Sequence, residues 1–120
     1  MLARALPVAL ILAALAIGCG GESRCGGGTR SRLSVWSEQQ GRIGAQFKLE
    51  GARPGAAWRL VLVHERQVWR GMAHANGDGA LTLTRHIDDY RGVDHVSVRA
   101  YGPDGATCAA STDFSSDAQT

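Results

Sequence analysis

The stretch IGAQFKLE, residues 43–50, alternates apolar residues with polar or small ones along its whole length. Successive side chains of a β-strand point to opposite faces of the sheet, so Ile43, Ala45, Phe47 and Leu49 share one face. The pattern therefore predicts a strand that covers a hydrophobic core with one face and meets water with the other. Outside the N-terminal apolar run, no long segment shows the 3.6-residue period of a helix, so we expect an all-β fold.

The rest of the chain repeats this design at short intervals. Residues 58–63 are apolar on both faces, which predicts a central strand. Pro, Gly, Asn and Asp cluster between the apolar segments and predict turns, as in residues 76–79. We therefore expect one antiparallel β-sandwich of about seven short strands. The expected core residues are Val35, Ile43, Phe47, Leu49, Trp58, Leu60, Leu62, Val68, Met72, Leu81, Leu83, Val96, Val98 and Ala100.

In strand count this arrangement resembles immunoglobulin-like and fibronectin-III-like modules. The resemblance implies two packed antiparallel sheets around one core. The sequence departs from true immunoglobulin domains because no cysteine lies in the second or the sixth expected strand. Another small β-barrel is the alternative fold.

Near the start of the chain, the basic residue Arg4 precedes an apolar run over residues 5–18, and Cys19 follows directly. This run is shorter than the ~20 residues that a membrane-spanning helix needs, and it is typical of a cleaved signal peptide. Residues 15–19, LAIGC, resemble the lipobox of bacterial lipoproteins, with Ala16 where Leu is usual. The resemblance implies cleavage before Cys19 and a thioether from its thiol to diacylglycerol, with palmitate among the acyl chains. An ordinary secretory signal is the alternative.

Composition and this resemblance divide the chain into four parts. We expect a signal peptide over residues 1–18, a lipidated flexible tether over 19–32, the β-sandwich over 33–114 and a polar tail over 115–120. Two or more acyl chains hold a protein on a membrane stably, whereas one chain does so only marginally. The resemblance therefore implies a bacterial envelope protein, anchored at the outer face of the cytoplasmic membrane or in an outer membrane if the source has one.

The cysteine count indicates one disulfide. With Cys19 assigned to lipid, Cys25 and Cys108 remain, in a compartment where disulfides persist. A bond between them would close a loop of about 84 residues and contribute about 4 to 5 kcal/mol in the chain-entropy model. We expect this intrachain bond, and two free thiols or an intermolecular bond are the alternatives.

Three aromatic residues suggest how the domain functions. Trp36, Trp69 and Tyr101 alternate with the residues assigned to the core, and Arg70 and Arg99 lie near two of them. Trp, Tyr and Arg are the side chains most enriched at binding hot spots. The sequence thus predicts a non-catalytic binding or scaffolding module that contacts an envelope protein or a glycan through Trp69 and Tyr101, with Trp36 contributing. The structural alternative is that each ring packs under a loop or the tether.

An enzymatic or metal-dependent accessory role is the alternative function, with a site built from His64, His74, His86 and the pair Asp88-Asp89. The histidine spacings match no zinc pattern, so we expect no metal, no cofactor and no catalytic residue. The 13 basic and 11 acidic side chains give a net charge of +2, a balance that does not indicate a nucleic-acid partner.

Overall fold

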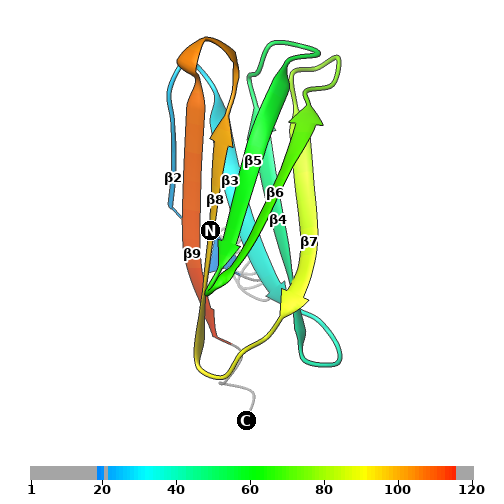
Figure 1. Ribbon diagram of the computed structural model, residues 1–120, viewed down its shortest axis with the longest axis vertical. Coiled ribbons are helices and arrows are strands. Elements are labelled where there is room, and N and C mark those ends of the chain that lie inside the picture. The colour runs from blue at the N-terminus through cyan, green and yellow to red at the C-terminus, as the bar shows by residue number, and fades with distance from the viewer. Residues whose placement is uncertain (1–18, 21, 116–120) are drawn as a thin grey trace, which may run out of the picture.

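A computed structural model describes residues 19–20 and 22–115 and shows an antiparallel β-sandwich (Figure 1). The described strands are β1 (Cys19–Gly20), β2 (Glu22–Cys25), β3 (Arg30–Ser37), β4 (Arg42–Glu50), β5 (Ala57–His64), β6 (Gln67–His74), β7 (Leu81–Asp88), β8 (Val93–Tyr101) and β9 (Thr107–Ser115). One 3₁₀ turn, η2 (Pro103–Gly105), precedes β9. The predicted all-β sandwich is confirmed.

Two sheets form the sandwich. The smaller sheet has the order β1-β3-β4-β7 and the larger one the order β2-β9-β8-β5-β6. The chain passes from one sheet to the other after β1, β2, β4, β6 and β7. The consecutive strands β3–β4, β5–β6 and β8–β9 pair within one sheet. Strand β4 pairs with β7, as strand B pairs with strand E in immunoglobulin-like sandwiches. In the larger sheet, β5 pairs with β8 and β8 with β9, as strand C pairs with F and F with G in those sandwiches.

The core lies between the sheets and is lined by alternate residues of each long strand. In β4, Ile43, Ala45, Phe47 and Leu49 are at most 1% exposed, as their alternation predicts. The other long strands of both sheets contribute most of the rest, because their inward residues share the same period of two. The buried hydrophobic residues are Leu33, Val35, Ile43, Ala45, Phe47, Leu49, Ala52, Ala56, Trp58, Leu60, Leu62, Ala75, Leu81, Leu83, Val96, Val98, Ala100, Cys108, Ala110 and Phe114.

Strand β6 turns toward the core the face that was predicted to be exposed. Val68 and Met72 were expected in the core, but they are 47% and 61% exposed. A two-residue turn after His64 pairs Leu62 with Trp69, so Trp69 shares the inner face of β5 and packs against the core. Both faces of β6 carry apolar residues, and the length of the preceding turn decides which of them points inward.

The segment predicted to be a tether over residues 19–32 is partly strand. Glu22–Cys25 forms β2, which pairs with β9, and β3 already begins at Arg30. The cause is the position of the disulfide, because Cys25 lies directly opposite Cys108 in the β2–β9 ladder. The predicted Cys25–Cys108 bond is present. It ties β2 to β9 as the edge strand of the larger sheet.

The segments predicted at the two ends of the chain fall partly outside the residues that the structure describes. The signal peptide predicted over residues 1–18 and the tail residues 116–120 lie outside the described residues. Strand β9 extends to Ser115, one residue beyond the predicted end of the sandwich. Among the residues that are described, no helix has the length and hydrophobicity required to cross a membrane.

Candidate functional site

The three aromatic residues predicted to share a binding surface lie on different parts of the sandwich. Trp36 alternates with the buried Val35 and therefore lies on the outer face of the smaller sheet. Tyr101 follows the buried Ala100 and lies on the outer face of the larger sheet. Trp69 points inward from the edge strand β6. The structure therefore does not assemble the predicted platform, and each ring has a separate environment.

Trp69 borders a groove along one side of the sandwich. Strand β6 ends the larger sheet and β7 ends the smaller one, and the two edges lie side by side (Figure 1). Between them is an open groove with a volume of about 480 Å³. It is lined by Arg42, Leu62, His64, Gln67, Val68, Trp69, Arg85, His86, Ile87 and Asp88.

Trp69 and Arg85 join the two edges of this groove. The guanidinium carbon of Arg85 lies 4.9 Å from the centroid of the Trp69 ring, within the range of a cation–π contact. The indole extends over Gly71, where a Cβ atom would overlap the ring. A glycine at position 71 therefore lets the indole lie flat along β6, with Arg85 on it.

A second cation of the groove, Arg42, is held by the neighbouring strand. Its Nη2 donates a hydrogen bond to the backbone oxygen of His86 at 2.9 Å. The His86 Nδ1 lies 2.8 Å from a carboxylate oxygen of Glu38, and the Trp36 Nε1–H donates to the same carboxylate at 3.2 Å. Glu38 thus fixes His86, while the guanidinium groups of Arg42 and Arg85 supply positive charge to the groove.

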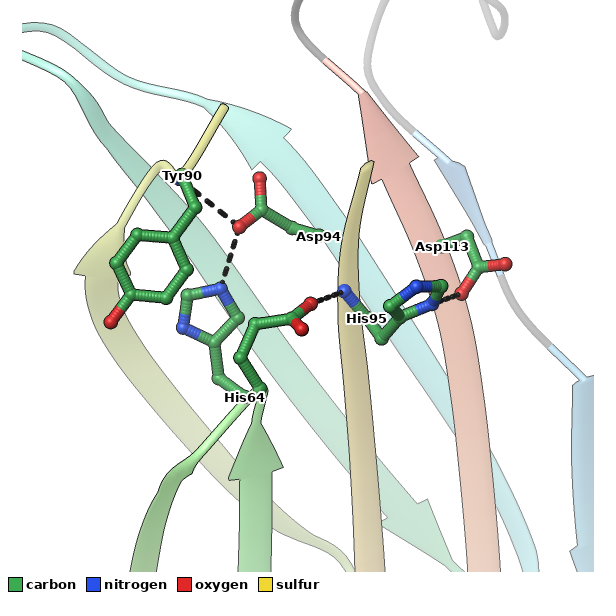
Figure 2. Close-up of polar contacts among 6 residues, drawn as sticks. His64, Tyr90, Asp94, His95 and Asp113 are labelled. Carbon is green, nitrogen blue, oxygen red and sulfur yellow. Dashed lines mark hydrogen bonds and ion pairs between the residues drawn. The ribbon is translucent and has the colours of Figure 1, made fainter. Parts of the chain in front are cut away.

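The innermost residue lining the groove is His64, which forms a buried pair with Asp94 (Figure 2). Both side chains are 0% exposed, and His64 Nε2 lies 2.8 Å from Asp94 Oδ1. The Tyr90 ring covers the imidazole in a parallel stack, with centroids 4.8 Å apart. The backbone N–H of Tyr90 also donates to Asp94 Oδ1 at 3.1 Å. The loop between β7 and β8 therefore closes this end of the core.

Burial dominates the electrostatics of this pair. Loss of water around the carboxyl raises the pKa of Asp94 above its ordinary value, while hydrogen bonds from His64 and from the Tyr90 backbone act in the opposite direction. His64 Nδ1 is buried and makes no hydrogen bond to the part of the chain that the structure describes. Because the His64 side chain is fully buried, this nitrogen is not exposed to a ligand in the groove.

The residues of the metal or enzymatic alternative are not brought together. His64 and His86 line the groove, but His74 pairs with Ala57 at the opposite end of β6, about 20 Å away along the strand. Asp88 lines the groove beside them. Within residues 19–20 and 22–115, no group of three His, Cys, Asp or Glu side chains is placed to hold a metal ion.

A second histidine pair lies outside the groove. His95 Nδ1 is 2.5 Å from Asp113 Oδ1 on the exposed surface of β8 and β9, as Figure 2 shows. This hydrogen bond and the negative charge of Asp113 raise the pKa of His95. The pair links the adjacent strands β8 and β9 on their outer surface and does not line the groove.

No protein-family model matches this chain, and no curated protein matches it. Its function is therefore inferred from the geometry. The members of the site that sequence reasoning missed are Arg42, Arg85, Tyr90 and Asp94. Asp94 alternates with the buried Val96, and a strict use of that period would have placed its carboxyl in the core.

Proposed function

We propose that this chain is a membrane-anchored extracytoplasmic lipoprotein and a non-catalytic binding module of the cell envelope. Its anchor is diacylglycerol on Cys19, and its ligand site is the groove between β6 and β7. The LAIGC sequence at residues 15–19 supports the anchor. The disulfide between Cys25 and Cys108 fits an oxidising compartment outside the cytoplasm.

The observation that carries the binding role is the combination of Trp69, Arg85 and Arg42 in one open groove. Guanidinium groups bind carboxylates and phosphates with paired hydrogen bonds, and the Trp69 indole positions that of Arg85 through the cation–π contact. These features favour an acidic ligand of the envelope, either a glycan or a segment of an envelope protein.

The ligand class can be tested by titrating the intrinsic tryptophan fluorescence. Acidic sugars and acidic peptides, each paired with a neutral analogue, are added to the purified protein. We expect a saturable change with an acidic ligand, because Trp69 borders the site. Arg85→Gln should weaken that binding about 10- to 100-fold, since a hydrogen bond to a charged group contributes about 1.5 to 3 kcal/mol.

Arg53→Gln is the matched control, because Arg53 is an exposed arginine that pairs with Asp104 and does not line the groove. This control should bind as the unmodified protein does. Equal affinity of Arg85→Gln and the unmodified protein for every acidic ligand would contradict the assignment of the groove.

A further inference from the structure

The outer face of the larger sheet carries an arginine on four of its five strands. Arg24 on β2, Arg99 on β8, Arg59 on β5 and Arg70 on β6 are all exposed. Each arginine either neighbours an inward-pointing residue in its own strand or lies opposite an outward-pointing residue of the next strand. All four side chains therefore point away from the core.

Three of these arginines form one row across the sheet. The register aligns Arg24 with Ala109, Ala109 with Arg99, Arg99 with Val61, and Val61 with Arg70. Neighbouring strands lie about 4.8 Å apart, so successive arginines of the row are about 10 Å apart. The row crosses the whole sheet from the β2 edge to the β6 edge.

The one acidic side chain described on this face outside the row, Asp113, is paired with His95. No acidic residue occupies the row, and none of its three arginines forms an ion pair within the described residues. Arg59 makes a cation–π contact with Tyr101, with its guanidinium carbon 4.8 Å from the ring centroid. On the opposite face of the sandwich, by contrast, Arg30 pairs with Glu50. The outer face of the larger sheet is therefore basic, although the net charge of the whole chain is only +2.

Protection of a sheet edge does not account for this arrangement. Charged residues often guard edge strands against pairing with other chains, but Arg59 and Arg99 lie on the interior strands β5 and β8. The same face also exposes Val68 and Met72 on β6. Cationic and apolar side chains together on one broad face suit the interface between lipid headgroups and acyl chains.

We propose that the outer face of the larger sheet lies on the anionic lipid headgroups of a membrane. A shallow hollow of about 330 Å³ between Arg24, Arg99 and Tyr101 offers room for a headgroup phosphate. Arg24 follows Cys19 by only five residues, so the proposed anchor would hold this face within reach of the bilayer. A lipid surface is favoured over a soluble acidic polymer because it also accommodates the exposed Val68 and Met72.

The interaction goes beyond the proposed function, and it can be measured without the lipid anchor. The chain from Gly20 to Thr120 retains β2 to β9, the disulfide and the whole buried core. It is mixed with vesicles of phosphatidylglycerol and phosphatidylcholine, or of phosphatidylcholine alone, and sedimented. We expect binding to the anionic vesicles only, weakening as salt is added.

Substitutions locate the face. Each arginine near an anionic surface contributes about fivefold in affinity, so Arg24→Gln, Arg70→Gln and Arg99→Gln together should weaken vesicle binding about a hundredfold. The matched control replaces Arg30, Arg32 and Lys48 by Gln, which removes the same charge from the other face. This control should lose less than about threefold, and both variants should keep the thermal unfolding midpoint of the parent chain.

Equal losses in the two triple variants would overturn the proposal, since they would reflect total charge alone. Binding to polyphosphate without binding to anionic vesicles would also overturn it, and would assign the face to a soluble polyanion. Neither result bears on the fluorescence titration of the groove, so failure here is distinguishable from failure of the proposed ligand site.

Discussion

Replacing both bridge cysteines by alanine, as Cys25→Ala with Cys108→Ala, is expected to lower the free energy of unfolding by about 4.6 kcal/mol. The two residues are 83 positions apart, so the bond closes a loop of 84 residues. In the chain-entropy model such a loop removes about 15 cal/mol/K from the unfolded ensemble, which is about 4.6 kcal/mol at 25 °C. For a domain of this size the same change lowers the unfolding midpoint by roughly 20 to 35 °C.

The measurement is equilibrium unfolding in guanidinium chloride, followed by the fluorescence of the buried Trp58. Reduction of the unmodified protein is the control, because it breaks the bridge and leaves both side chains in place. The reduced protein and the double variant should agree within about 1 kcal/mol. A loss below about 1 kcal/mol in both would refute the loop-entropy argument.

Two further predictions concern the histidine pairs, and both use the same unfolding assay. Asp94→Ala leaves His64 buried without its partner and should cost about 3 to 5 kcal/mol, so an unchanged midpoint would contradict the buried pair. Asp113 raises the pKa of His95, so the stability that this pair adds is complete below about pH 6.5 and is lost as the pH rises through the raised pKa. His95→Gln should remove that pH dependence, and a parallel pH profile for variant and parent would count against it.

The fold was predictable where one face of a strand is apolar and the other polar. Residues 43–50 obey this rule, and β4 has the expected burial. Strand β6 does not obey it, since Val68 and Met72 alternate with Trp69, Gly71 and Ala73. Only the turn before β6 decides between the two faces, and a shift of one residue exchanges them. The wrong choice there placed Trp69 on the surface.

The candidate site was harder to predict because it depends on which sheet each strand joins. The turn at residues 76–79 was interpreted as a local turn, yet it carries the chain from the larger sheet to the smaller one. That crossing places Trp69 beside Arg85. The row of Arg24, Arg99 and Arg70 likewise emerges only from the register of five strands. Short-range patterns contain neither piece of information.

The intact mass of the protein extracted from membranes tests the lipid-anchored role most directly. We expect a mature chain that begins at Cys19 and carries diacylglycerol on the thiol of that residue. Cys19→Ala should then leave no mature chain of this kind in the membrane fraction. A mature chain that begins at another residue, or that retains an unmodified Cys19 thiol, would contradict the account.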